Sequence, residues 1–465
     1  MLKQKNITLI LFTLAFGTLL GGLNSMMFNV ALPTMVSYFN APLSKVQWLT
    51  SGYMLAAGSI IPASGFLGDR FGYKRVFSLC LIAVLVLSIV GSFAWCIEAL
   101  IVVRFLFGLT AGLLAPLSLT MMYRILPVSQ QPTAASTWGI ANFIGAILPT
   151  VLSGLILSVA SWKFLLLFNI PFVVFALLLS LRFVPQDAVQ NNSKLDFLGL
   201  VLLSSGSFVL LFTFSNLSRW GFTIRFLFGL CFGFALLGAY VLKNKNNETA
   251  ILNLKVFQYS RYVAAFATGC INIVAITTVA FLTPLFLQNG LGISPLVTGL
   301  VMFPCSICSV IAMPVARKYY GALGEKRLAT IGLAIVIIGS TPFLFVTPAT
   351  SIILVIVALC IRSCGISAYN LVVTNAQMAA IPTQLSGHAS SLTNWSHQMI
   401  TALLAGVVSN VIDLRLLASQ ATTIKETAVI YTTTTNMIMA FSCILLASMI
   451  PVALKFFRGK GELHS

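Results

Sequence analysis

Charged side chains gather in one short stretch of the sequence, GFLGDRFGYKR, which begins at Gly65. The stretch contains three basic residues, Arg70, Lys74 and Arg75, and a carboxylate, Asp69, although only 8% of the chain is charged. A carboxylate in this position can pair with Arg70 or Arg75, or it can cap the N-terminal end of a neighbouring helix. Its glycines permit a tight turn and a close approach of two helices. We interpret the stretch as a conformational latch rather than as simple membrane-surface anchors, with these residues taking part: Gly65, Asp69, Arg70, Gly72, Lys74 and Arg75.

Titratable side chains are rare within the long apolar runs of the sequence. Arg104 and Arg362 each lie inside such a run, where a charge is costly and is by default a functional-site hypothesis. Each arginine can line a cavity and couple to a proton site or a substrate, or it can only hydrogen-bond helix ends. His397 is the one group inside a run that titrates near neutral pH. It can carry a proton or only make packing hydrogen bonds.

Neutral polar residues are frequent for a chain of this hydropathy. Some must join helices through hydrogen bonds. Others, together with Met and aromatic side chains, can line an adaptable cavity that accepts varied amphipathic compounds. The candidates for this cavity are Met26, Trp138, Asn142, Tyr369, Asn394 and Gln398.

The residues needed for enzyme chemistry are missing. The sequence has no Ser-His-Asp set, no Cys-x-x-Cys pair with a His partner and no phosphate loop of Walker spacing. We therefore expect no enzyme activity, no cofactor and no metal. The nine cysteines are interpreted as small packing residues.

The composition places these residues in a membrane. Of 465 residues, 58% are hydrophobic, and the mean hydropathy is +1.00, whereas a soluble domain carries roughly a quarter charged residues. The apolar runs lack the alternation of a barrel, so they must be helices. Basic residues outnumber acidic ones by 27 to 9, but they are scattered singly between apolar runs. The positive-inside rule explains this distribution better than nucleic-acid binding does.

The apolar runs predict an all-α membrane protein with fourteen spans and both termini in the cytoplasm, because this orientation places roughly three times as many basic residues inside as outside. The expected spans are Thr8–Leu32, Val46–Leu67, Val76–Phe93, Ala99–Met122, Ala134–Val159, Phe164–Phe183, Phe197–Leu217, Ile224–Leu242, Tyr262–Leu287, Pro295–Val315, Leu328–Val346, Ser351–Val373, Ala389–Val411 and Tyr431–Leu454.

An internal repeat divides the chain. The layout of Ser44–Arg75 returns in Ser294–Arg327, where a Pro near the inner end is again followed by a turn ending Gly-x-Lys-Arg. Transporters use repeats of this kind to build two halves around a midplane site. We expect a six-helix half at 1–185, an inserted two-helix hairpin at 186–255 and a second six-helix half at 256–465.

These residues together resemble the major facilitator superfamily, and within it the fourteen-helix drug:proton antiporter branch. GFLGDRFGYKR matches that superfamily's loop signature, and RFLFGLTAG resembles its fourth-helix motif with Arg104, Gly108 and Gly112 in place. NVALPTM and PLFLQNGLGISPLVTGL are similar to the branch as well. One departure concerns the first helix, where the branch usually carries an Asp and this chain has Asn24. Another is Leu148, which stands before Pro149 where the fifth-helix signature usually has Gly.

The resemblance implies a secondary active transporter of a bacterial plasma (inner) membrane. Its expected activity is proton-coupled efflux of hydrophobic or amphipathic compounds by alternating access. Its expected partners are a small-molecule substrate, the proton and the lipid bilayer, and it is expected to act as a monomer. Asn24 joins Arg104, Arg362 and His397 as a candidate for coupling or for the cavity. Two alternatives stay open, an exporter of a lipid-like or anionic metabolite and a membrane sensor that moves no net substrate.

Overall fold

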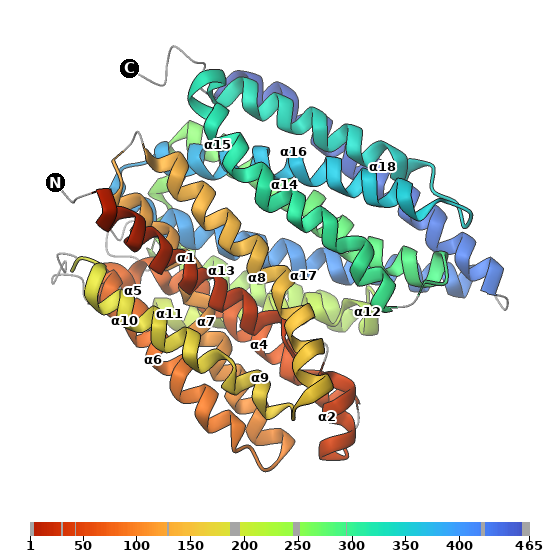
Figure 1. Ribbon diagram of the computed structural model, residues 1–465, viewed down its shortest axis with the longest axis horizontal. Helices are drawn as coiled ribbons and strands as arrows, with labels where there is room; N and C mark the ends of the chain where they lie inside the picture. The colour runs from red at the N-terminus through yellow and green to blue at the C-terminus, as the bar shows by residue number, and fades with distance from the viewer. Residues whose placement is uncertain are drawn as a thin grey trace. The chain divides into compact units, whose positions relative to one another are not determined.

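The computed structural model describes residues 4–28, 31–41, 43–127, 130–186, 196–244, 252–293, 295–419 and 424–457. In these ranges the chain is helical and contains no strand (Figure 1). The α-helices are α1 (Gln4–Met26), α2 (Leu32–Phe39), α3 (Leu43–Val46), α4 (Trp48–Ile60), α5 (Ser64–Phe71), α6 (Tyr73–Ser92), α7 (Ile97–Ile125), α8 (Gln131–Val159), α9 (Lys163–Leu167), α10 (Asn169–Phe183), α11 (Phe197–Ser215), α12 (Leu217–Trp220), α13 (Ile224–Asn244), α14 (Ser260–Leu285), α15 (Pro295–Ser340), α16 (Ile352–Ala379), α17 (Ser386–Ser419) and α18 (Ile424–Phe456). The shorter helical turns are η1 (Ile61–Ala63), η3 (Leu254–Gln258), η4 (Phe286–Gly290), η5 (Thr341–Leu344) and η6 (Thr383–Leu385).

The all-α prediction is confirmed for the described residues, and 11 of their helices are long and apolar enough to cross a membrane. Each expected span overlaps a helix, but two of them are merged in α15, whose interior break is Gly324 with φ 76°. The second expected span is divided into α4, η1 and α5, with Pro62 in the short 3₁₀ turn. The count of fourteen spans and the orientation of the termini remain predictions.

The chain forms two compact units, which are described separately. Unit 1 contains residues 1–212, 230–256 and 381–395, and unit 2 contains 213–229, 257–380 and 396–465. The division passes through α11, α13 and α17. It follows spatial proximity rather than chain order, so the expected division at residues 185 and 255 stays a prediction.

In unit 1, helix α7 packs against α4, α6 and α1, and α1 also packs against α8 and α10 (Figure 1). Small residues allow the closest of these contacts. A Cβ atom on Gly108 of α7 would lie 2.3 Å from the carbonyl oxygen of Tyr53 on α4, and one on Gly112 would lie 2.8 Å from the Cα of Ala57. This close approach of α4 and α7 brings Arg104 within reach of the α4 main chain.

In unit 2, helix α16 packs along α15 and against α14, and α18 packs against both α14 and α15 (Figure 1). Gly332 and Gly365 let α15 and α16 approach closely, because a Cβ atom on Gly365 would lie 2.7 Å from the Gly332 carbonyl oxygen. Phe286, Phe343 and Met439 belong to a buried apolar cluster in the core of this unit.

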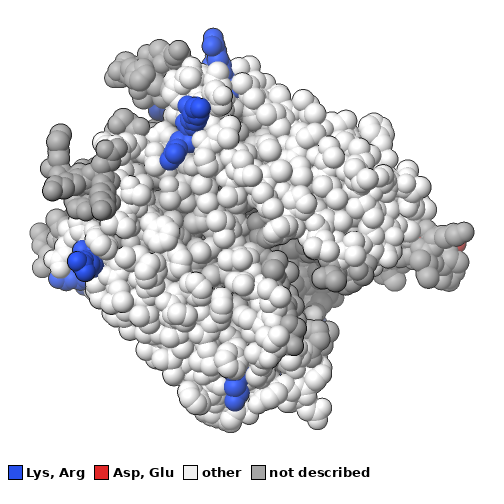
Figure 2. All heavy atoms as spheres, in the orientation of Figure 1, with Lys and Arg blue, Asp and Glu red and all other residues white. Residues whose placement is uncertain are grey.

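The surface is consistent with a lipid environment. Most of the face in Figure 2 carries no charge, and the few Lys and Arg side chains visible there lie near its margins. Large apolar side chains such as Phe228, Ile353 and Leu178 are exposed. Lipid, rather than water, is the solvent that makes such exposure favourable.

Candidate functional site

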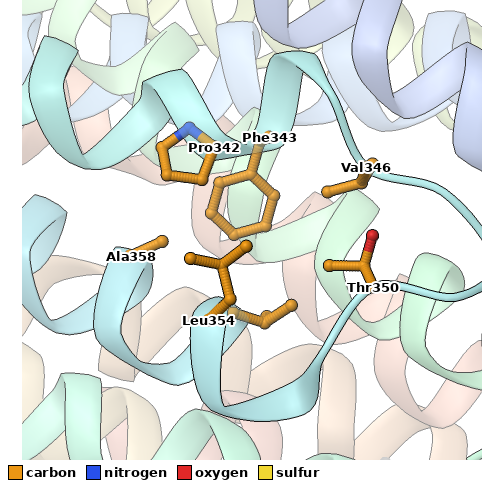
Figure 3. A pocket seen from close by; sticks show the side chains of 7 residues that line it. Pro342, Phe343, Val346, Thr350, Leu354 and Ala358 are labelled. Atoms are coloured by element: carbon orange, nitrogen blue, oxygen red, sulfur yellow. The ribbon is translucent and has the colours of Figure 1, made fainter.

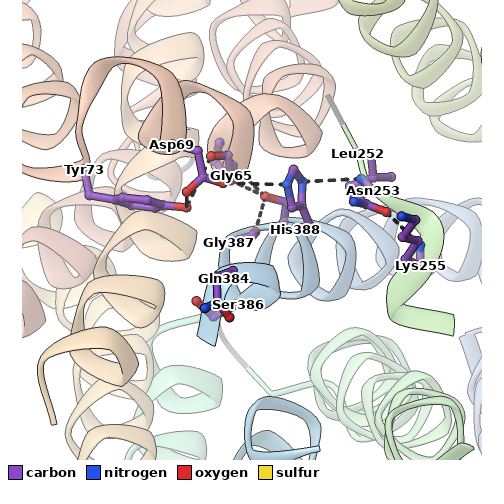
Figure 4. A network of polar contacts seen from close by, with 12 residues as sticks. Gly65, Asp69, Tyr73, Leu252, Asn253, Lys255, Gln384, Ser386, Gly387 and His388 are labelled. Atoms are coloured by element: carbon purple, nitrogen blue, oxygen red, sulfur yellow. Dashed lines mark hydrogen bonds and ion pairs between the residues drawn. The ribbon is translucent and has the colours of Figure 1, made fainter. Parts of the chain in front are cut away.

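The charged turn predicted from the sequence is a sharp corner between α5 and α6 in unit 1. Gly72 both ends α5 and precedes α6, with φ 87° and ψ 129°. Glycine adopts this backbone conformation readily, whereas a residue with a Cβ atom is strained there. The corner directs the last turn of α5, with Asp69, and the first turn of α6, with Tyr73, toward the same neighbours (Figure 4).

Asp69 is the centre of a network of polar contacts (Figure 4). Its Oδ1 atom accepts a hydrogen bond of 2.7 Å from Nη2 of Arg124 on α7, and the Tyr73 hydroxyl lies 3.2 Å from the same oxygen. Its Oδ2 atom lies 3.6 Å from Nε2 of His388 on α17. The Arg124 guanidinium also stacks over the Tyr73 ring, 4.3 Å from its centre. Both members of the ion pair are mostly buried, which strengthens such charge-assisted contacts.

Arg124 extends this network to the beginning of α17. Its Nε donates to the Ser386 hydroxyl at 3.3 Å, and Nη2 also donates to the Gln384 carbonyl at 3.3 Å. The five donor hydrogens of a guanidinium allow one arginine to join α5, η6 and α17 in this way.

Next to the ion pair, the backbones of α5 and α17 are in contact. The Gly65 N–H donates to the Ser391 hydroxyl at 2.9 Å, and the Ser391 hydroxyl in turn donates to the Gly387 carbonyl at 2.7 Å. A Cβ atom on Gly65 would lie 2.6 Å from the carbonyl carbon of Gly387. Glycine is therefore required at position 65 while this contact exists.

The remaining residues of the predicted latch lie around this centre. Lys74 donates to the Leu181 carbonyl of α10 at 2.9 Å, Arg70 lies over the Phe71 ring, and Arg75 is exposed. The sequence interpretation offered Arg70 or Arg75 as a partner of Asp69, and the structure adds an ion pair between Asp69 and Arg124. The other option, that Asp69 caps the N-terminal end of a neighbouring helix, stays a prediction, although Asp69 lies beside the side chain of His388 in the first turn of α17.

The sequence analysis did not single out Arg124, Ser391 or His388. Arg124 follows an apolar run, where a basic residue is typical of the membrane surface. The run SGHASS at residues 386–391 is the signal that could have been used, because small residues at the start of a helix permit backbone contact.

Arg104 is completely buried in unit 1. Its Nε donates to the Leu49 carbonyl and its Nη2 to the Asn24 carbonyl, each at 3.0 Å. The guanidinium lies 4.3 Å from the ring centre of Phe28 and 4.4 Å from that of Tyr53. Carbonyl dipoles and aromatic faces thus stabilise the positive charge. These contacts agree with the helix-joining reading of Arg104.

Asn24 lies next to Arg104 and is also buried. Its Nδ2 donates to the Leu20 carbonyl at 2.8 Å, and its Oδ1 accepts from Nδ2 of Asn169 at 2.9 Å. The amide therefore joins α1 to α10. An acid at this position would keep the Asn169 contact and would place a negative charge beside Arg104.

Arg362 has a similar environment in unit 2. It is 3% exposed, its Nε donates to the Ser340 hydroxyl at 2.9 Å, and its Nη2 donates to the Ala275 carbonyl of α14 at 2.6 Å. As with Arg104, a buried guanidinium joins its own helix to two others. The correspondence agrees with the internal repeat seen in the sequence.

A second buried carboxylate, Glu325, was not singled out from the sequence. It follows Gly324, the positive-φ residue of α15, and is 1% exposed. Its two oxygens are held by Nη2 of Arg261, at 2.5 Å, and by the Tyr320 hydroxyl, at 2.8 Å. In the sequence this acid occurs within the repeated Gly-x-Lys-Arg turn, at the position that Tyr73 occupies in the first turn.

The candidate cavity residues belong to both units. In unit 1, Trp138 donates to the Ala115 carbonyl, and the amides of Asn142 and Asn394 donate to carbonyls one turn back in their own helices. In unit 2, Tyr369 is fully buried, and Gln398 is half-buried. The side chain of Met26 lies outside the described residues.

His397 belongs to unit 2, on α17. Its Nε2 atom is buried and has no hydrogen-bond partner within the described part of the chain. If this nitrogen takes up a proton, the imidazole becomes positively charged. A buried positive charge is unfavourable unless other groups stabilise it.

A shallow apolar recess in unit 2 lies between η5 and the start of α16 (Figure 3). Its lining residues are Pro342, Phe343, Val346, Thr350, Leu354, Val355 and Ala358. It contains none of the residues singled out from the sequence, and it is too shallow to enclose a ligand. Within the described residues, no group of three His, Cys, Asp or Glu side chains is placed to hold a metal ion.

Comparison with known proteins extends the sequence resemblance. A sequence model described as Major Facilitator Superfamily matches residues 14–406. The chain is 27% identical over 413 residues to YhcA of Bacillus subtilis, an uncharacterized MFS-type transporter, covering 88% of this chain and 77% of the relative. It is 25% identical over 403 residues to the lincomycin resistance protein LmrB of Listeria monocytogenes, covering 86% and 84%. It is 27% identical over 330 residues to the putative multidrug resistance protein MdtD of Escherichia coli, covering 70% of each.

Solved structures share the fold. The human organic anion transporter MFSD10 aligns with a TM-score of 0.67 at 15% identity, covering 95% of this chain and 99% of that one. The proton:xylose symporter XylE aligns with a TM-score of 0.64 at 14% identity, covering 97% of each chain. At these identities the likeness concerns the fold alone.

Proposed function

This chain belongs to the Major Facilitator Superfamily, whose members are membrane transporters and not enzymes, and we propose that it exports hydrophobic or amphipathic small molecules in exchange for protons. Two relatives at 25% and 27% identity are named for resistance to lincomycin and to multiple drugs. Their names support efflux as the direction and amphipathic compounds as the substrate class. The bacterial origin of these relatives supports a bacterial plasma membrane as the location.

The contact between α5 and α17 is the observation that carries the mechanism. Alternating access needs a contact that closes one end of the transport path and can be released. Gly65, Asp69 and Arg124 meet the first turn of α17, which shares its later residues with unit 2. In our proposal this latch holds the cytoplasmic end closed while the site is open to the outside, and its release lets the site face the cytoplasm.

The energetics fit a reversible latch. Its centre is one charge-assisted hydrogen bond, supplemented by neutral hydrogen bonds. Such contacts contribute about 0.5–3 kcal/mol each, which is the range in which a ligand or a proton can shift a two-state equilibrium. A large dry apolar contact would be harder to release.

The positions of charged residues in the described helices suggest which substrates are accepted. Asp69, Glu98, Glu325 and Glu426 lie at helix ends or next to the turn at Gly324, and Asp413 lies within the last two turns of α17. Arg104 and Arg362 lie within α7 and α16. A buried cation without a carboxylate nearby is unfavourable by several kcal/mol. We therefore propose that neutral, zwitterionic or anionic amphiphiles are preferred over permanent monocations. This observation also favours the second candidate function, export of a lipid-like or anionic metabolite.

Exchange for protons needs a group that takes up and releases a proton. We propose His397, whose buried Nε2 atom has no hydrogen-bond partner among the described residues. The substrate itself can also carry the proton if it is a weak acid.

Purified protein in proteoliposomes tests the proposal. The internal pH is followed while a panel of cationic, neutral and anionic amphiphiles is added, and uptake of each compound is measured in parallel. We expect proton movement that depends on neutral or anionic compounds and is abolished by a protonophore. Flux of a compound without proton movement would rule out the proton as the coupling ion. Absence of flux for the whole panel would favour the sensor alternative.

A further inference from the structure

The segment that follows the hairpin helix α13 is attached to that helix by a pair of hydrogen bonds. The Leu252 N–H donates to the Tyr240 hydroxyl oxygen at 2.7 Å, and the same hydroxyl donates to the Leu252 carbonyl at 3.2 Å. Tyr240 is 2% exposed. A tyrosine hydroxyl can donate once and accept at the same time, so one side chain satisfies both polar groups of residue 252.

The next residue carries this attachment to α17 (Figure 4). Asn253 N–H donates to Nδ1 of His388 at 3.4 Å, while Asn253 Oδ1 accepts from the Lys255 N–H at 2.9 Å. The second bond fixes the direction of the Asn253 peptide at the start of η3. Val256, in the same turn, is buried.

The two nitrogens of His388 therefore face two different partners. Nδ1 accepts from Asn253, and Nε2 lies 3.6 Å from Oδ2 of Asp69. An imidazole that accepts at one nitrogen carries its proton on the other. The Asn253 contact thus fixes the tautomer in which the N–H of Nε2 is directed at the Asp69 carboxylate.

The two helices of the hairpin, α11 and α13, are also joined to each other near Tyr240. Asp196, just before α11, forms an ion pair with Lys243 near the end of α13, and it accepts a hydrogen bond of 2.8 Å from the Gly199 N–H. Lys243 lies about one turn after Tyr240 on α13. Higher along α11, Ser207 accepts a hydrogen bond of 2.9 Å from the Trp395 indole of α17. The hairpin is consequently connected to α17 both through residues 252–253 and through Ser207.

We propose that residues 252–256 form a third component of the cytoplasmic latch, and that His388 is the positioning residue through which the inserted hairpin sets the strength of the Asp69 contact. The inference rests on the proposed latch function. It assigns a regulatory role to the hairpin, which has no counterpart in the internal repeat. Removing the hydrogen bonds of Tyr240 should therefore weaken the contact between His388 and Asp69, although Tyr240 does not touch either residue.

Hydrogen–deuterium exchange of the full chain in lipid nanodiscs tests this coupling. In Tyr240→Phe, which removes only the hydroxyl, we expect exchange to rise about threefold or more in peptides covering 252–258, 384–392 and 64–72. Tyr319→Phe is the matched control, because it makes the same change at an exposed position of α15, and it should change none of these peptides. A rise confined to 252–258 would overturn the inference.

Two substitutions of His388 separate its two contacts. Asn can accept from Asn253 in place of Nδ1, whereas Gln can donate to Asp69 in place of Nε2. We expect His388→Asn to protect 252–258 but to loosen 64–72, and His388→Gln to do the reverse. If both variants loosen all three segments equally, His388 has only a structural role.

Asp69→Asn distinguishes the inference from the proposed function. If this variant transports normally and leaves exchange at 64–72 unchanged, the latch itself is wrong. If it loosens the latch while Tyr240→Phe does not, only the role of the hairpin is wrong.

Discussion

Gly65 and Gly387 are 322 positions apart in the sequence, yet a Cβ atom on Gly65 would lie 2.6 Å from the Gly387 carbonyl carbon. Real Cβ atoms do not approach backbone atoms so closely, so the contact can exist only between residues without side chains. Gly65→Ala should therefore prevent α5 and α17 from meeting. Overpacking of this kind costs about 1–3 kcal/mol, and we expect the transport rate to fall about tenfold while membrane insertion is unchanged.

Gly299→Ala is the control for this prediction, because a Cβ atom on Gly299 of α15 would meet nothing within 4 Å. Transport and expression are measured for both variants. Equal transport by Gly65→Ala and Gly299→Ala would show that the contact with Gly387 is not needed in the cycle.

The Asp69 carboxylate is the second target. Asp69→Asn keeps the shape of the side chain but removes the charge that Arg124 pairs with, and charge-assisted hydrogen bonds contribute about 1.5–3 kcal/mol. We expect transport to fall about tenfold or more, with normal folding. Glu98→Gln is the control. It removes the carboxylate of the exposed ion pair with Lys45, and because exposed pairs contribute little, it should leave the transport rate nearly unchanged. Wild-type rates in Asp69→Asn would contradict the latch.

Arg104 should contribute to stability. Arg104→Lys keeps the charge, but an ammonium cannot donate to the Leu49 and Asn24 carbonyls and stack between the Phe28 and Tyr53 rings at the same time. We expect a loss of about 1–3 kcal/mol, seen as a lower thermal unfolding temperature in detergent. Arg182→Lys, at an exposed position, is the control and should unfold like the unmodified protein.

Permanent monocations should be poor substrates. Cells expressing the unmodified protein are expected to show little efflux of ethidium-like dyes, and Asn24→Asp should give a partial gain. Opposite charges attract by about 4 kcal/mol at 4 Å for an effective dielectric constant of ~20, but Arg104, which donates to the Asn24 carbonyl, will offset part of the new charge. Strong dye efflux by the unmodified protein would refute this prediction.

The ion pair between Asp196 and Lys243, which joins the two helices of the hairpin, should lose its contribution to stability only at acidic pH. Burial raises the pKa of Asp196, but the hydrogen bonds from Lys243 and from the Gly199 N–H outweigh it, so the net pKa lies below its usual value. A lowered folded-state pKa stabilises the protein above the unfolded pKa of about 3.9, and this contribution is lost as the pH falls through the folded value. The stability difference between wild type and Asp196→Asn should stay constant from pH 8 to pH 5 and shrink below about pH 4. A difference that changes between pH 8 and pH 5 would contradict this assignment.

Much of the helical architecture could be predicted from the sequence, because lipid leaves a chain of this composition few alternatives to helices. The turn at Gly72 was also visible, since three glycines and four charges are conspicuous between apolar runs. The partners of that turn were not. Arg124 and Ser391 are 55 and 322 positions from Asp69, and nothing in the spacing of one helix tells which other helix lies against it.

Helix boundaries were predicted less well where one helix is followed by the next with no polar loop between them. Gly324 turns with φ 76° inside α15, and Pro62 interrupts the second expected span with a short 3₁₀ turn. Hydropathy alone does not detect such changes. The cavity residues raise a different difficulty, because an Asn that bonds to its own helix and one that faces a substrate have the same sequence pattern.

The division of α17 between the two units has a consequence for protein engineering. Residues 386–395 of this helix belong with the first unit, and residues 396–419 belong with the second. A chimera that joins the first half of this transporter to the second half of a relative would give Gly65 and Asp69 a foreign α17. Such hybrids should work only when the donor supplies glycine at 387 and hydrogen-bonding side chains at 388 and 391, or when the crossover points are placed so that residues 381–395 stay with their native partners.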